Sequence, residues 1–268
     1  TTQYADSVRT ALRAGADAIV CGAGLPKDLP ALASEVSDSD AAIAPIVSSG
    51  RAAGLLCKLW DRHYGRIPDF LILEGPEAGG HLGFSRQDLD APPSLSDLLR
   101  EVLTTIAPFR DKAGRDIPVF VAGGVKNGAD MARYMKEGAA GAQFATRFIA
   151  TAECDASDGY KQRLLNASPG DITLVKSPVG MPGRALRSPL IRRVEDGTQP
   201  PPDRCMKCIT TCDGKNAPYC ISRALIAARN GDWENGLFFC GANAGEINTL
   251  STVQQQMAQI MDEWRNAQ

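Results

Sequence analysis

One loop of the sequence combines a glycine-rich backbone with a histidine, the side chain best suited to exchange a proton near neutral pH. Residues 74–83 read Glu-Gly-Pro-Glu-Ala-Gly-Gly-His-Leu-Gly and directly follow an apolar stretch of strand length. Glycines expose backbone N–H groups and leave room for a planar ring. His81 is therefore the candidate acid or base, and Gly80 beside it is a candidate ligand contact. The alternative is an ordinary turn with a surface histidine.

A second pair of segments has the composition of a phosphate site. In barrel enzymes, the loops after the last two strands commonly hold a phosphate through backbone N–H donors. We expect one phosphate to contact both segments, through Gly123 and Gly124 in the first and Gln143, Phe144, Ala145 and Thr146 in the second. The alternative is close packing of a helix on the sheet at Gly124, with Arg147 buried beside an acid.

Four cysteines form a third group within sixteen residues, namely Cys205, Cys208, Cys212 and Cys220. Four thiolates could close a tetrahedral Zn²⁺ site or hold an iron–sulfur cluster, and either would fasten a Pro-rich segment that lacks its own core. The alternatives are reduced cysteines packed against the helix that follows, or a redox pair formed by Cys205 and Cys208.

Strand-length apolar stretches alternate with segments whose apolar residues recur every three or four positions, as in amphipathic helices. The predicted strands cover residues 18–21, 43–47, 70–73, 118–121 and 141–144. This alternation predicts βαβ units and a parallel sheet, and small residues follow the strands where such folds place their sites. Five strands cannot close an eight-stranded barrel, so we expect about three more before Thr1, unless the sheet is open.

Three parts are expected along the chain. Residues 1–165 form the barrel portion, 166–218 form an irregular Pro/Gly-rich insert with the cysteines, and 219–268 form a helical segment that packs on the barrel. Within the last part, the spacing of apolar residues predicts helices at 219–230 and 252–264.

Composition favours a soluble protein that acts on a small-molecule substrate. Its 29 Lys and Arg against 31 Asp and Glu give a net charge of −2, so there is no basic field to attract nucleic acid or a membrane surface. No apolar run approaches the ~20 residues that span a bilayer. The spread of the cysteines is unlike a secreted disulfide framework, which predicts a cytoplasmic location.

The three motifs around His81, Gly123 and Gln143, in this order and spacing, resemble the nitronate monooxygenase (2-nitropropane dioxygenase) family, which includes the flavin-dependent enoyl-acyl carrier protein reductase II. The resemblance runs from the first helix to about Phe148 and implies an FMN-binding (β/α)₈ TIM barrel, of which the C-terminal strands are present, with a Cys-containing extension. It implies that FMN phosphate lies near Gly124 and residues 143–146.

The same resemblance implies that Glu74 and Gly79 lie near the flavin ring or ribityl chain and that His81 is the catalytic histidine. The sequence departs from the family pattern in three places. The N-terminal Gln-Gly-Gly-Met type of flavin contact is absent, Glu74 stands where typical members have Gln, and Ala145 stands where Gly is usual. Typical members also lack the four-cysteine group.

The function implied by the resemblance is FMN-dependent oxidation of nitronates with O₂, with His81 as acid or base. Three alternatives stay open: an enoyl-thioester reductase that uses NAD(P)H as reductant, a metal- or Fe–S-binding electron-relay subunit, and a barrel enzyme that binds a phosphorylated substrate without flavin. As protein partners we expect a second copy in a homodimer, or a segment that supplies the missing strands.

Overall fold

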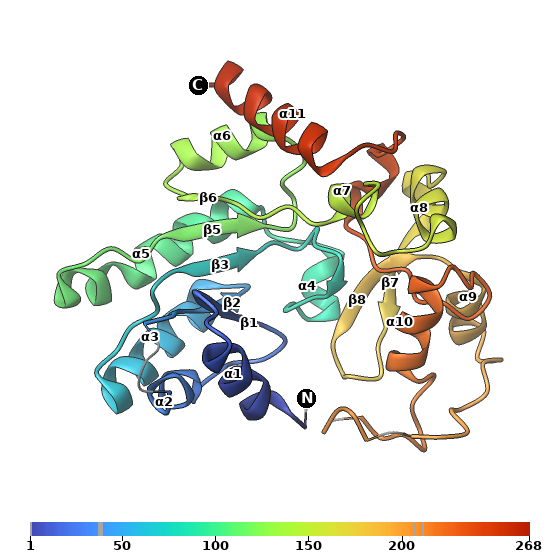
Figure 1. Cartoon of the computed structure of the whole chain (residues 1–268), viewed down its shortest axis with the longest axis horizontal. Helices are drawn as coiled ribbons and strands as arrows, with labels where there is room; N and C mark the ends of the chain where they lie inside the picture. The colour runs from blue at the N-terminus through green and yellow to red at the C-terminus, as the bar shows by residue number, and fades with distance from the viewer. Residues whose placement is uncertain (1, 37–39, 206, 211) are drawn as a thin grey trace.

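The fold is described from a computed structural model, for residues 2–36, 40–205, 207–210 and 212–268. Five parallel strands form one sheet in the order β1-β2-β3-β5-β6, seen at the left of Figure 1. These strands are β1 (Ala18–Cys21), β2 (Ala42–Val47), β3 (Leu71–Glu74), β5 (Val119–Ala122) and β6 (Gly141–Ala142). All five predicted strands are present, and the α/β class with a parallel sheet is confirmed.

Helices connect successive strands, as parallel pairing requires. The connecting helices are α2 (Leu29–Ser34), α3 (Gly50–Tyr64), α4 (Arg86–Asp90), α5 (Leu95–Ala113) and α6 (Gly128–Lys136). Helix α1 (Tyr4–Arg13) precedes β1, and α7 (Thr146–Ile149) and α8 (Asp158–Leu165) follow β6. Local sequence sets the ends of the longer ones. The side chains of Ser49, Ser94 and Asn127 accept N-terminal hydrogen bonds from α3, α5 and α6. Gly65 and Gly114 end α3 and α5 in the left-handed conformation.

The main core lies between the sheet and the helices α3 and α5. Its fully buried side chains include Leu56, Trp60, Leu71, Leu73 and Leu99. The indole N–H of Trp60 donates to the carbonyl of Pro26 at 3.0 Å, which satisfies the one polar group of this ring. This core fixes the strands whose carboxyl ends carry the candidate site.

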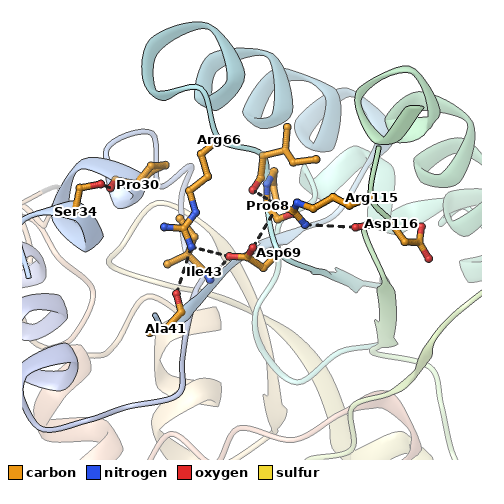
Figure 2. Close-up of polar contacts among 10 residues, drawn as sticks. Pro30, Ser34, Ala41, Ile43, Arg66, Pro68, Asp69, Arg115 and Asp116 are labelled. Carbon is orange, nitrogen blue, oxygen red and sulfur yellow. Dashed lines mark hydrogen bonds and ion pairs between the residues drawn. The ribbon is translucent and has the colours of Figure 1, made fainter. Parts of the chain in front are cut away.

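A polar cluster ties the opposite ends of the strands together (Figure 2). One carboxylate oxygen of Asp69 accepts the backbone N–H of Ile43 and the guanidinium of Arg66, both at 2.8 Å. Its other oxygen accepts the guanidinium of Arg115 at 3.2 Å, while Arg115 also donates to the carbonyl of Ile67 at 2.9 Å. Asp69 therefore joins β2, the start of β3 and the loop before β5, at the ends of the strands away from the site.

The segment expected to be irregular contains regular structure, so that expectation was wrong. β7 (Ile172–Lys176) and β8 (Pro182–Leu186) pair antiparallel, and β4 (Gly80–His81) joins the edge of β8. Helix α9 (Pro189–Glu195) follows. Of the prolines and glycines that predicted an irregular insert, Pro178 and Gly180 lie in the turn between β7 and β8, while Pro182 and Gly183 lie in β8 itself. Pairing with a distant strand supplies hydrogen bonds that no local pattern reveals.

The C-terminal part contains both predicted helices, α10 (Ile221–Arg229) and α11 (Val253–Asn266). α11 lies along α6 at the top of Figure 1, and the contact is close at Gly128, where a Cβ would lie 1.9 Å from the carbonyl of Ile260. Between α10 and α11, Leu237 and Phe238 are fully buried, and Phe238 accepts the N–H of Leu186 at 2.9 Å. Among the described residues, no helix has the length and apolar character needed to cross a bilayer.

Candidate active site

The carboxyl ends of β3, β5 and β6 meet around one cavity of about 100 Å³. Sheet register brings them together, because Glu74 lies opposite Ala122 and the N–H of Gln143 donates to Val121 at 2.8 Å. The lining includes eight of the nine predicted cofactor contacts, namely Glu74, Gly79, Gly123, Gly124, Gln143, Phe144, Ala145 and Thr146. Gly80 is not in the lining, and β4 begins at that residue.

Glycines allow the two loops at this cavity to touch backbone to backbone. A Cβ on Gly75 would lie 2.3 Å from the carbonyl oxygen of Gly123. Gly123 itself has φ +67°, and a Cβ there would lie 2.7 Å from Ala78. A side chain at either position would force the loops apart, so the cavity depends on glycine at both.

Glu74 is the buried carboxyl of this cavity. Burial raises its pKa to about 7, and a backbone hydrogen bond from Gly83 opposes the increase. The side chain is therefore partly protonated near neutral pH and can donate a hydrogen bond as well as accept one.

His81 lies on β4 beside the cavity and is paired with a buried serine. Its Nε2 atom is 2.7 Å from Oγ of Ser177, which is 6% exposed. The ring packs edge-on against Phe239, with the ring centroids 5.1 Å apart. Burial lowers the pKa of His81, so the imidazole is neutral near pH 7 and its tautomer depends on which of the two partners donates.

Arg184 holds the glycine-rich loop in place. From β8, its Nη1 atom donates to the carbonyls of Pro76 at 2.6 Å and Ala78 at 2.7 Å. Burial lowers the pKa of Arg184, and the attraction of Glu77 opposes that effect. These two charge-assisted bonds fix the loop from Gly75 to Gly80 and, through β4, the position of His81.

Sequence reasoning missed Ser177, Arg184 and Phe239. They lie 96 or more positions from His81 along the chain, and each reaches the site by pairing of β4 with β8 and of β8 with residue 239. The only sequence signal was the alternation of residues 172–176, which the neighbouring prolines and glycines obscured.

A second cavity, of about 720 Å³, opens next to the histidine pair. Ser177 belongs to its lining, and so do Leu82, Phe84 and Met181, which make it largely apolar. Two cations, Arg86 and Lys176, also line it. The space therefore suits an apolar substrate portion with an anionic group attached.

At the opposite end of the first cavity lie groups that favour an anion. Arg147 lines it with a side chain 15% exposed, and its guanidinium donates to the carbonyl of Lys126 at 3.1 Å. The carboxylate of Glu263 is 3.9 Å from that guanidinium, so the predicted buried arginine with an acidic neighbour is present as well. Thr146 accepts the N–H of Gly241 at 2.9 Å, which places residues 241–243 on the rim.

The four cysteines of the third group line a separate small cavity. Cys205 is exposed, while Cys208, Cys212 and Cys220 are half-buried, and all four are free. Burial and the three neighbouring thiols raise the pKa of Cys212. In the part of the chain that is described, no three His, Cys, Asp or Glu side chains already stand together so that they could hold a metal ion.

Comparison with known proteins bears out the resemblance. The family model described as nitronate monooxygenase matches residues 1–263, nearly the whole chain. The chain belongs to the nitronate monooxygenase family. Similar family relatives are a (3aS,4S,5R,7aS)-5-hydroxy-7a-methyl-1-oxo-octahydro-1H-indene-4-carboxyl-CoA dehydrogenase of Mycobacterium tuberculosis, 34% identical over 131 residues, and a probable nitronate monooxygenase of Staphylococcus saprophyticus, 29% identical over 136 residues.

These matches cover about half of this chain, 49% and 50%, and about a third of the relatives, 33% and 36%. Among solved structures, FabK from Thermotoga maritima has a TM-score of 0.75 at 25% identity, over 99% of this chain and 73% of that one. The nitroalkane oxidase of Streptomyces ansochromogenes has a TM-score of 0.74 at 21% identity, over 98% of this chain and 68% of that one. The barrel class expected for this family agrees with these likenesses.

Proposed function

We propose that this chain carries the flavin- and substrate-contacting part of an FMN-dependent oxidoreductase of the nitronate monooxygenase type. Membership of the family supports the class of reaction. The observation that carries the proposal is the pairing of His81 with Ser177 at 2.7 Å, beside a glycine-lined cavity at the carboxyl ends of parallel strands.

The residues around the first cavity fit one end of FMN. Gly123 and Gly124, at φ +67° and +129°, line the cavity without side chains, and Arg147 adds a positive charge to the lining. At about 100 Å³ the cavity is smaller than the roughly 300–1,000 Å³ of whole-ligand pockets. We therefore propose that Gly123, Gly124 and residues 143–146 hold the phosphate and part of its chain, with Glu74 and Gly79 toward the ring.

Bound FMN would supply the electron acceptor, which O₂ can reoxidise. The protein's own groups move the proton. Because its imidazole is neutral near pH 7, His81 can accept the α-proton of a neutral nitroalkane, which produces the nitronate that is then oxidised, and Ser177 fixes the orientation of the ring. Phe239 packs edge-on against the ring of His81 and covers that side of it. The partly protonated Glu74 is a hydrogen-bond donor to the cofactor.

The second cavity favours one other candidate function, an NAD(P)H-dependent reductase of enoyl thioesters. Its volume of about 720 Å³ exceeds what a small alkyl nitronate fills, and Arg86 and Lys176 would pair with the phosphates of a thioester carrier. A relative that acts on a carboxyl-CoA, as its name states, agrees with this arrangement.

A direct comparison of substrates separates the two functions. On the flavin-loaded protein, we expect O₂ uptake with an alkyl nitronate and, for the alternative, oxidation of NADH or NADPH that depends on an enoyl-CoA. With the neutral nitroalkane as substrate, His81→Gln should keep its flavin and lose about 10²-fold or more of turnover, and Ser177→Ala should lose less. Full turnover of His81→Gln with flavin retained would refute the role of the histidine. A purified protein that holds no flavin, and takes up none when FMN is added, would refute the cofactor.

The setting proposed with this function is the cytoplasm, with a homodimer or a partner segment that completes the barrel. The eight free cysteines suit a reducing compartment. The division at residues 165 and 218 is proposed as well, with β7 and β8 now part of the middle segment. Light scattering coupled to size exclusion measures the oligomeric state, and a monomer with full activity would argue against a dimer.

A further inference from the structure

The connection between α9 and α10 is long and has little to hold it. It runs from 196 to 220, and its described residues contain no helix or strand. Only Ala217 and Tyr219 among them are buried. Connections longer than about 12–15 residues without their own regular structure are uncommon and usually have a functional role or an added tether. The hydrophobic effect alone does not account for an ordered path here.

Four cysteines of this connection surround one small space. Cys205, Cys208, Cys212 and Cys220 all line a cavity of about 20 Å³. That volume takes a single atom or ion the size of a water molecule. We propose that these four thiols form a tetrathiolate site for one thiophilic divalent cation, of which Zn²⁺ is the ordinary occupant in proteins.

The backbone around Cys205 is shaped to support a sulfur ligand. The N–H of Lys207 donates to Sγ of Cys205 at 3.4 Å. Lys207 adopts φ +51°, a left-handed conformation that a residue with a side chain rarely takes. From another direction the backbone of Gly214 approaches the same sulfur, since a Cβ there would lie 2.7 Å from it. Both contacts hold the sulfur of Cys205 in place at the cavity.

The site closes as the cation binds. In the described ranges the thiols line the cavity without standing as a finished ligand set, which is usual where metal binding and local folding are coupled. Cys208 is 3.2 Å from the hydroxyl of Ser222, a contact that its sulfur exchanges for the metal. Each thiol releases its proton to solvent, so four thiolates and one divalent cation carry a net charge of −2. The guanidinium of Arg204, which lines the same cavity, lies next to that charge.

One residue links this site to the candidate active site. Tyr219 lines the cysteine cavity, and its hydroxyl donates to the carbonyl of Lys176 at 3.0 Å. Lys176 ends β7 and precedes Ser177, the partner of His81. The cation therefore fixes the connection that holds Tyr219 against the end of β7, and Tyr219 acts as a positioning residue for the serine.

Metal analysis of the full-length, flavin-loaded protein tests the proposal. The protein is purified without oxygen or chelator, and metals are measured by plasma mass spectrometry on wild type, Cys212→Ser and Cys154→Ser. Cys154 is half-buried and lies outside the group, so it is the matched control. We expect about one zinc per chain in wild type and the control, and about a tenth of that or less in Cys212→Ser.

Three results would overturn the proposal: zinc retained at full stoichiometry in Cys212→Ser, iron with labile sulfide in place of a single ion, or disulfide pairs among these cysteines in the fresh protein. If Cys212→Ser does not fold, Co²⁺ added to demetallated wild type should give the visible bands of a tetrathiolate complex, saturating at one ion per chain. Absence of those bands counts against the site. Flavin content is measured on the same samples, and it tests the proposed oxidoreductase separately.

Discussion

Replacing Glu74 with glutamine removes a carboxyl whose ionisation is opposed by its surroundings. Burial raises its pKa from the ordinary 4.5 to about 7. At about 1.4 kcal/mol for each tenfold change in acidity, this difference amounts to at most about 3 kcal/mol. Solvent reaches part of the side chain and weakens the effect, so we expect about 2 kcal/mol.

The sign of the pH dependence of stability follows from the fact that Glu74 holds its proton more tightly in the native state than in the unfolded chain. Between pH 4.5 and about 7 the native state keeps this proton while the unfolded chain has lost it. The free energy of unfolding therefore decreases as the pH rises through this window, and above about 7 the decrease is complete. Glutamine does not titrate. The free energy of unfolding of Glu74→Gln, measured relative to wild type, should therefore be about 2 kcal/mol higher at about pH 8 than at about pH 5.

Urea unfolding followed by circular dichroism measures this gain on the flavin-free proteins at the two pH values. The comparison uses the difference between variant and wild type, which cancels every other titrating group. Glu77→Gln is the matched control, since it removes one negative charge from the same loop at an exposed side chain. If the difference between Glu74→Gln and wild type is the same at both pH values, then the carboxyl is not buried as described and the reasoning is wrong.

Three further substitutions test other parts of the site and fold. Arg184→Lys leaves one ammonium in place of the guanidinium that reaches two loop carbonyls, so we expect about 1–2 kcal/mol less stability and weaker retention of flavin, measured by urea unfolding and by absorbance. Gly123→Ala should cost about 2 kcal/mol or more and abolish flavin binding. Gly114→Ala, also at positive φ but with open space around it, should cost less and keep the flavin. Asp69→Asn should lower stability by about 1 kcal/mol without changing flavin content or turnover, and a large loss of turnover would contradict its structural role.

The parallel half of the fold could be predicted from sequence because its signals are local. Apolar stretches such as residues 71–74 and 119–122 are bounded by glycine or proline, and caps such as Ser49 mark the helices. The carboxyl ends of parallel strands lie together at one edge of the sheet, so the glycines that follow these strands predicted the lining of the cavity. The same reasoning placed eight of nine predicted contacts around one cavity, although their binding role stays a prediction.

The other half of the site could not be predicted in this way. Ser177 and Arg184 reach the loop at His81 through antiparallel pairing of β4 with β8, more than ninety positions away. Strand propensity depends on such partners more than on the strand itself, so β7 and β8 gave no clear pattern beside their prolines and glycines. A single sequence does not reveal which distant strand pairs with a strand as short as β4, which has two residues.

The glycine loop after β3 and the β7–β8 hairpin each supply different groups of the candidate site. The glycine loop contributes the imidazole, while the β7–β8 hairpin contributes the hydroxyl that orients it and the guanidinium that fixes its backbone. The hairpin is joined in turn to the cysteine connection through Tyr219. A change that loosens the cysteine connection should therefore alter the orientation of His81, and with it turnover, more than it alters the proposed phosphate contact at Gly123, which directly follows β5 of the parallel sheet. Flavin affinity and turnover should accordingly separate in Tyr219→Phe, with turnover reduced and flavin retained, and equal loss of both would place the connection in the cofactor site itself.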